Sequence, residues 1–134
     1  MNRAFLRSAI EGLVSKYDYT FQLNSNAYYP TTVHSYPVAF MNQPEFASIE
    51  GRKNGRITYK VSLLLARQGA KLNTTERNTL LDTMERELMD IFIALSQTER
   101  VAVVDDLTIT PYPEAIDSHG AIALKAEAYV TTIF

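Results

Sequence analysis

The chain has 134 residues, of which 46% are hydrophobic and 21% are charged, and its formal net charge is −2. This length and composition predict one folded domain, residues 1–134, and exclude a disordered chain. The small negative charge excludes a global attraction to nucleic acid, the absence of cysteine excludes disulfides and thiolate chemistry, and no apolar run is long enough to cross a membrane.

The N-terminal segment predicts an amphipathic helix over residues 3–17, with Asn2 as its N-cap. Its apolar side chains recur three or four residues apart: Phe5, Leu6, Ala9, Ile10, Leu13, Val14 and Tyr17. Residues 19–23 then alternate briefly between apolar and polar side chains before a loop rich in tyrosine. We expect residues 19–32 to be irregular or to form an edge ribbon.

Three strand-like runs precede the next helix. Pro37 should stand at the entrance of a strand over residues 38–41, because proline cannot donate to a central ladder. Residues 46–50 and 56–66 predict two further strands, and Asn54-Gly55 between them favours a tight hairpin turn. The second of these strands has the clearest alternation, with one face made of Ile57, Tyr59, Val61, Leu63 and Leu65.

The second half of the chain predicts one helix and two strands. Asn73 and Glu76 have the spacing of a capping box, so a helix should begin near residue 74 and continue to about residue 96. A strand over residues 101–110 contains Asp105-Asp106, which indicates a bulge, an edge or an exposed strand end. The alternating tail, residues 121–134, predicts a final strand antiparallel to its predecessor.

These elements predict an α+β fold in the order α-β-β-β-α-β-β. We expect a mostly antiparallel sheet of four to five strands, with the two helices packed on one face of it. The alternating strand over residues 56–66 and the helix after it should supply much of the core, because each buried large apolar side chain contributes roughly 1.5–3 kcal/mol.

Nearly the whole chain follows an order of an amphipathic helix, a proline-led strand (Tyr36-Pro37-Val38-Ala39-Phe40), a long alternating strand, a polar loop into a helix, and a closing strand. The last three features occupy residues 57–65, 75–95 and 123–133. This order resembles the tail-terminator proteins of long-tailed bacteriophages and the related neck (head-tail joining, tail completion) proteins. The likeness is one of element order and length, without an invariant motif.

The resemblance implies a non-enzymatic structural virion protein that forms a ring at the head-tail junction, terminates the tail tube and docks it to the head connector. Rings of this family are usually hexamers. The implied partners are copies of the chain itself, the tail-tube protein and the head connector or a portal-associated protein, with transient passage of DNA and no membrane. The implied location is the virion tail, after assembly in the host cytoplasm. The family has no catalytic residues or cofactor to carry over.

The residues themselves favour no catalytic, cofactor or metal site. Asp117-Ser118-His119 resembles a hydrolase set only in composition, because a working triad converges from separate elements; a polar turn is the better interpretation. The chain has two histidines, His34 and His119, and with Asp105-Asp106 they supply too few clustered ligands for a metal.

The one local charge cluster surrounds the predicted hairpin turn, where Arg52, Lys53 and Arg56 give a basic tip. It could line the lumen of a ring and meet passing DNA, pair with acidic residues of a neighbouring subunit, or be a solvated turn. Tyr28 and Tyr29, together with Tyr112, are candidate interface aromatics, although partial core packing explains them equally well.

Two other classes of function remain open. One is a small ferredoxin-like ligand-binding domain or enzyme, with its site on the open sheet face; the other is an adaptor that binds a protein through an edge strand. A ring protein should expose apolar surface on its lateral edges, whereas a ligand-binding domain should have one concave pocket with converging polar groups.

Overall fold

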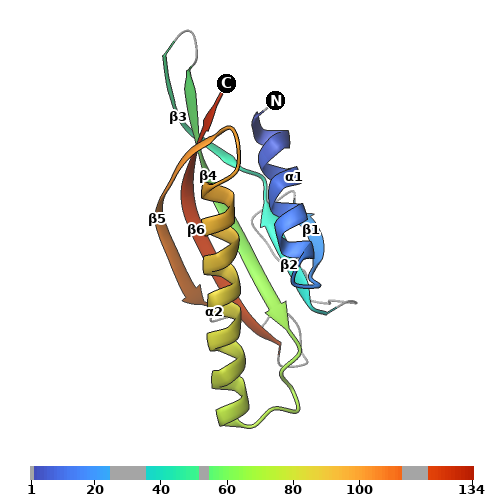
Figure 1. Cartoon of the computed structure of the whole chain (residues 1–134). Coiled ribbons are helices and arrows are strands. Elements are labelled where there is room, and N and C mark those ends of the chain that lie inside the picture. Colours follow the sequence, from blue (N-terminus) through green and yellow to red (C-terminus); the bar gives the residue numbers. More distant parts are fainter. Residues whose placement is uncertain (1, 25–35, 52–54, 113–120) are drawn as a thin grey trace.

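In the part of the chain that the structure describes, a six-stranded sheet carries two helices (Figure 1). The computed structural model describes residues 2–24, 36–51, 55–112 and 121–134. In chain order the elements are α1 (Asn2–Ser15), β1 (Thr20–Asn24), β2 (Val38–Asn42), β3 (Glu45–Glu50), β4 (Arg56–Arg67), α2 (Thr74–Ser96), β5 (Val101–Pro111) and β6 (Ile122–Ile133).

The strands lie in the order β1-β2-β4-β6-β5, and β3 also pairs with β4. Every pair is antiparallel except β1 with β2, so the predicted α+β class with a mostly antiparallel sheet is confirmed. The expected number of four to five strands is wrong, because four strands precede α2 and the sheet has six. The additional strand is β1, whose backbone pairs in parallel with β2, a non-local pairing that its short sequence does not signal.

Both helices pack on one face of the sheet, as predicted, and share one core with it. The apolar stripe of α2 packs on β5 and β6 and shares one core with the alternating side chains of β4, and α1 covers the region of β1 and β2 (Figure 1). The fully buried large side chains of this core include Leu6, Ile10, Met41, Leu63, Leu65, Met84, Leu88, Ile91 and Leu95.

The expectation that Asn2 caps α1 from outside is wrong. Asn2 lies in the first turn and is buried, and its Nδ2 donates to Thr132 Oγ1 at 2.9 Å. Its Oδ1 accepts from Nη2 of Arg100 at 2.8 Å. The side chain therefore ties the start of α1 to the last strand, because a buried amide needs hydrogen-bond partners and these lie about 100 residues or more along the chain.

A second apolar cluster occupies the face of the sheet that carries no helix. It consists of Val38, Phe40, Leu64, Ala66 and Ala123, with Tyr36 and Tyr112 packed against it. The alternation of β4 ends here, because all residues from Leu63 to Ala66 are buried. The inner half of β4 is thus covered on both faces, while Thr58, Lys60 and Ser62 are only partly buried.

Two local predictions from the sequence are confirmed. Asn73 Oδ1 accepts from the Glu76 amide at 2.9 Å, and Glu76 Oε1 accepts from the Asn73 amide at 3.1 Å, which completes the capping box. In β5 the register shifts between Asp105 and Thr108, and Asp106 has a φ of 55°, so the paired carboxylates mark a bulge. β6 runs antiparallel to β5, as expected.

We predict that adjacent residues of α2 differ sharply in their contribution to stability. Leu88→Ala should lower the free energy of unfolding by about 2–5 kcal/mol, because it opens a cavity beneath the helix. Met89→Ala, on the exposed side, should change it by less than about 0.5 kcal/mol. Urea denaturation of both variants measures the difference, and similar losses would contradict the assigned orientation of α2.

Candidate functional site

A hairpin formed by β3 and the outer half of β4 projects beyond the ends of both helices (Figure 1). Every residue of β3 is exposed, which is unusual for a strand that contains two large apolar side chains. Phe46 and Ile49 are each 56% exposed. Within the described residues β3 pairs with β4 alone, so its outer backbone edge is open.

The apolar side chains of this hairpin gather on the side that faces the helices. The register places Phe46 opposite Tyr59 and Ile49 opposite Ile57, so all four side chains share the face of the sheet that contains the core. The Phe134 ring extends this surface, because a Cβ at Gly55 would overlap it and the Phe134 amide donates to the Gly55 carbonyl at 3.0 Å. We call this surface the apolar hairpin face; it consists of Phe46, Ile49, Ile57 and Phe134.

Cations border the apolar hairpin face at its base. Arg3 Nε donates to the carbonyl of Pro44 at 3.1 Å, and its guanidinium lies 5.6 Å from the centre of the Tyr59 ring. The guanidinium of Arg100 lies 4.9 Å from the centre of the Phe5 ring. The carboxylates of β3, Glu45 and Glu50, lie on the opposite face of the hairpin.

Glu45 lies opposite Lys60 and Glu50 opposite Arg56, which places both acids on the helix-free face of the hairpin. Among the residues near Arg3 and Arg100 in the sequence, the acidic one is Glu99, which lies in the turn directly before Arg100. The salt bridges found among the described residues involve neither Arg3 nor Arg100. The base of the hairpin therefore presents apolar surface beside unpaired positive charge.

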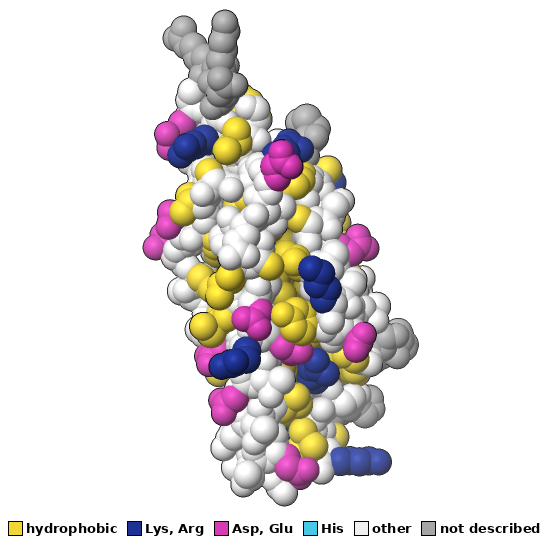
Figure 2. All heavy atoms as spheres, in the orientation of Figure 1, with side chains coloured by type: hydrophobic (Ala, Val, Ile, Leu, Met, Phe, Trp, Pro, Cys, Tyr) yellow, Lys and Arg dark blue, Asp and Glu magenta, His cyan; other side chains and the backbone are white. Residues whose placement is uncertain are grey.

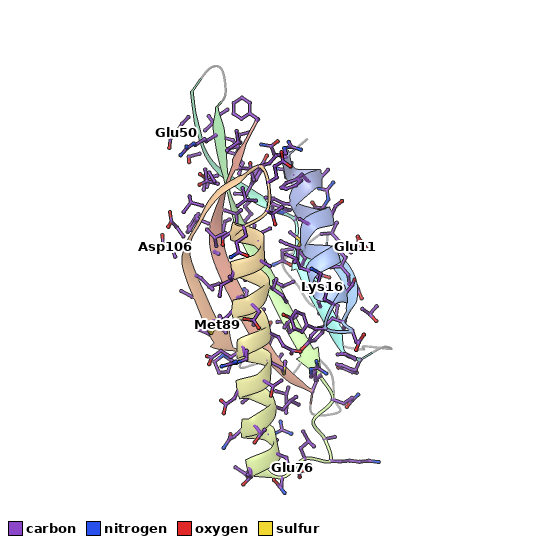
Figure 3. All side chains as sticks on the ribbon, in the orientation of Figure 1. Glu11, Lys16, Glu50, Glu76, Met89 and Asp106 are labelled. Carbon is purple, nitrogen blue, oxygen red and sulfur yellow. The ribbon has the colours of Figure 1, made fainter. Side chains whose placement is uncertain are left out.

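The outer surface of α2 has the opposite character. Met89 and Ile93, one turn apart, are 47% and 51% exposed although the helix has a separate buried stripe. The charged residues around them are mostly acidic: Asp82, Glu85, Arg86 and Asp90. Figure 2 shows hydrophobic side chains set among charged ones along α2, and Figure 3 shows Met89 on the side of α2 away from α1. We call this surface the outer α2 stripe.

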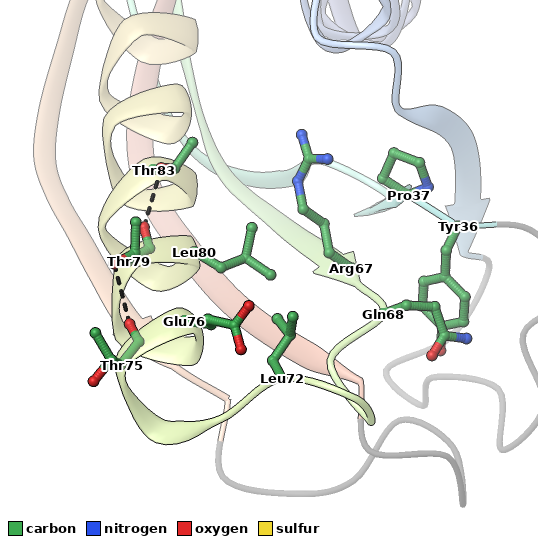
Figure 4. Close-up of a pocket in the computed structure, with 10 residues that line it drawn as sticks. All are labelled: Tyr36, Pro37, Arg67, Gln68, Leu72, Thr75, Glu76, Thr79, Leu80 and Thr83. Atoms are coloured by element: carbon green, nitrogen blue, oxygen red, sulfur yellow. Dashed lines mark hydrogen bonds between the residues drawn. The ribbon is translucent and has the colours of Figure 1, made fainter.

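A pocket of about 640 Å³ lies at the other end of the molecule, beside the first half of α2 (Figure 4). It opens between this helix and the ends of β2 and β4. The lining residues are Tyr36, Pro37, Arg67, Gln68, Leu72, Thr75, Glu76, Thr79, Leu80 and Thr83.

The polar groups of this pocket are largely used within the protein. Thr79 Oγ1 donates to the Thr75 carbonyl at 3.1 Å, and Thr83 Oγ1 donates to the Thr79 carbonyl at 3.0 Å. Glu76 is held in the capping box, and Arg67 is held by an ion pair. The pocket therefore offers a wall of methyl groups and apolar side chains, and its polar groups do not converge on a point where a substrate would react.

A buried polar network beside the pocket joins three elements. The Tyr19 hydroxyl donates to Glu87 Oε1 at 2.7 Å and accepts from Arg67 Nε at 2.9 Å, while Arg67 Nη2 lies 3.0 Å from Glu87 Oε2. Burial and the hydrogen bond to Glu87 raise the pKa of Tyr19. The phenol therefore stays protonated at neutral pH, and the network links α2 to β4 without supplying a nucleophile or a base.

The network does not follow from the sequence alone, although the sequence contains one signal for it. Glu87 lies on the buried side of α2, between Met84 and Ile91, and is only 8% exposed. A carboxylate within an apolar stripe requires a partner, because an isolated buried charge is strongly unfavourable. Arg67 at the end of β4 supplies that partner, but its position depends on tertiary packing.

Most of the predicted site residues lie outside the described part of the chain. Arg56 is exposed on β4, as the hairpin hypothesis requires. Tyr112 is half-buried against the second apolar cluster, which agrees with the packing alternative for that residue. The residues outside the described ranges are Arg52, Lys53, Tyr28, Tyr29, His34, Asp117, Ser118 and His119.

No protein-family model matches the chain, and no curated protein matches it with significant sequence similarity. Within the described ranges, no group of three or more His, Asp or Glu side chains is placed to hold a metal ion. Neither of the described helices is long and apolar enough to span a membrane.

We predict that the buried network depends on its charge pairing. Arg67→Met should lower the free energy of unfolding by about 2 kcal/mol, less than for a fully buried pair because the Arg67 side chain is 27% exposed. The triple variant Tyr19→Phe/Arg67→Met/Glu87→Leu should lose less, because it leaves no buried charge unpaired. Urea denaturation compares the two, and a larger loss in the triple variant would contradict this account.

Proposed function

We propose that this chain is a structural virion protein of a bacteriophage that forms a ring at the head-tail junction, terminates the tail tube and docks it to the head connector. The observation that carries the proposal is the projecting hairpin. A strand exposed along its whole length, with Phe46 and Ile49 uncovered, leaves apolar surface that is unfavourable in water unless a partner covers it.

The order of elements supports the same proposal. The described helices and strands keep the opening helix, the proline-led strand, the long central strand, the capped helix and the closing strand in which the chain resembles tail terminators and neck proteins. β1 adds one strand to that series, between the opening helix and the proline-led strand. Similarity of fold is a weak argument for function when it stands alone, and here the exposed surfaces add to it.

The distribution of apolar surface favours assembly over ligand binding. A ferredoxin-like ligand-binding domain or enzyme would need a pocket whose polar groups remain available to a ligand. The pocket beside α2 has most of its polar groups bonded within the protein, including those of Thr79 and Thr83. By contrast, the apolar hairpin face and the outer α2 stripe are two separate exposed surfaces, as a subunit with two neighbours requires.

The open edge of β3 supports one alternative, an adaptor that accepts a strand from a different protein. The two hypotheses differ in the partner: an adaptor binds another polypeptide, whereas the proposed ring consists of identical subunits. In the ring, which we expect to be a hexamer, the further partners are the tail-tube protein and the head connector or a portal-associated protein. Arg56 and the neighbouring Arg52 and Lys53 would then border the path along which DNA passes, without a membrane, a cofactor or catalysis.

Deletion of the gene should give DNA-filled heads without attached tails, together with tails of uncontrolled length. The reason is that a tube without its terminal ring neither stops growing nor presents a surface to the head. Electron microscopy of the particles measures this result, with the gene supplied from a plasmid as the control. Intact infectious particles from the deletion would contradict the proposal.

Reversal of the basic hairpin should impair assembly or DNA delivery and leave folding unchanged. Arg52→Glu/Lys53→Glu/Arg56→Glu alters charges at and beside the turn, and changes on an exposed surface usually shift stability by less than about 0.5 kcal/mol. Thermal denaturation should therefore give a melting temperature within a few degrees of the native one, while the phage titre falls. A normal titre would leave the solvated turn as the better account of these residues.

A further inference from the structure

We infer that the apolar hairpin face of one subunit packs on the outer α2 stripe of a second copy of this chain. The inference deepens the proposed ring and rests on its requirement that the chain associates with itself. Both surfaces expose large apolar side chains that belong to regular elements. The hairpin projects beyond the ends of the helices (Figure 1), whereas Met89 lies on the side of α2 away from α1 (Figure 3). One subunit can therefore use both surfaces at once, each with a different neighbour.

The first argument is the match in apolar character. The hairpin offers Phe46, Ile49 and Phe134, exposed by 56%, 56% and 45%, on one side of a two-stranded ribbon. The stripe offers Met89 and Ile93, which protrude from adjacent turns of a long helix. A helix laid on the face of a ribbon buries both sets together, which is how α2 already packs on the inner half of this sheet.

The second argument is charge complementarity. Arg3 and Arg100 border the apolar hairpin face. The outer α2 stripe carries Asp82, Glu85 and Asp90 against the single cation Arg86. None of these side chains takes part in a salt bridge with another described residue. Each surface thus surrounds an apolar centre with charge that is mainly of one sign, the usual organisation of a protein interface.

The separation of charge on the hairpin supports this orientation. The carboxylates of Glu45 and Glu50 point to the helix-free face, away from the side on which the acidic stripe would dock. If these acids shared a face with Phe46 and Ile49, they would repel Glu85 and Asp90 of the neighbour. The register of β3 on β4 therefore selects the helix side of the hairpin as the side that an acidic helix can approach.

The chain contains no cysteine, so single cysteines can report the contact directly. Ile49→Cys and Met89→Cys proteins, one of them carrying a mass tag, are mixed at about 1 mM and treated with a short bismaleimide. At that concentration even a contact with a millimolar Kd is substantially occupied. The inference requires a cross-linked heterodimer in excess of either homodimer. The matched control is Ser48→Cys mixed with Met89→Cys, because Ser48 lies opposite Thr58 on the other face of the hairpin and should give little product.

The double variant Ile49→Cys/Met89→Cys extends the test to closure. Head-to-tail contacts should give a ladder of cross-linked species whose largest member equals the copy number of the ring. Adding Ile93→Asp to the Met89→Cys protein places a charge in the apolar centre of its stripe and should weaken its association with the Ile49→Cys protein by at least about tenfold. Circular dichroism confirms that each variant stays folded, as expected for exposed positions.

The outcomes separate this inference from the proposed function. Equal cross-linking with Ser48→Cys and Ile49→Cys, or no product from either, overturns the assigned contact. If that result is found and the gene deletion still gives heads without tails, the proposed ring stands and its subunits must meet through a different interface. A specific cross-link together with intact phage from the deletion would retain the contact and overturn the role at the head-tail junction.

Discussion

The structure depends on how β4 divides one of its edges between two partners. Along one edge it pairs with β6 over its full length, while on the other edge residues 63–66 pair with β2 and residues 56–60 pair with β3. The half beside β2 is buried on both faces, and the half beside β3 extends past the helices. One continuous strand thus belongs to the core at one end and to the projecting hairpin at the other. The packing of β4 in the core therefore fixes the direction in which the hairpin projects.

Elements with strong local signals could be predicted from the sequence, and pairings between distant segments could not. The capping box at Asn73 and the 3.6-residue period after it define α2 within a few residues, because both signals act within one helix. The parallel pairing of β1 with β2 joins segments separated by residues 25–37, and no local pattern specifies it. Asparagine is a favoured residue at the N-cap of a helix, but the contact of Asn2 with Thr132 makes this side chain part of the core.

The candidate surfaces could be located only in part. The basic residues around the turn indicate an exposed hairpin, but the sequence does not show which face carries Phe46 and Ile49. A register shift between Phe46 and Ser48 breaks the strict alternation, so only the pairing with Tyr59 and Ile57 assigns both side chains to the helix side. Similarly, Met89 and Ile93 are as apolar as residues of the core. Only the positions of the buried residues around the helix show that these two side chains point outward.

The proposed ring also gives a physical role to the buried network. The hairpin continues β4 and the stripe belongs to α2. Arg67, at the inner end of β4, and Tyr19 bond to Glu87 in the middle of α2 and so join the two elements. The angle between the two contact surfaces is therefore set within each folded subunit. In a head-to-tail assembly that angle determines the rotation from one copy to the next, and hence whether and at what number the ring closes. In the proposed ring, closure on the end of a tube makes several contacts act together and would supply stability that a single pair lacks.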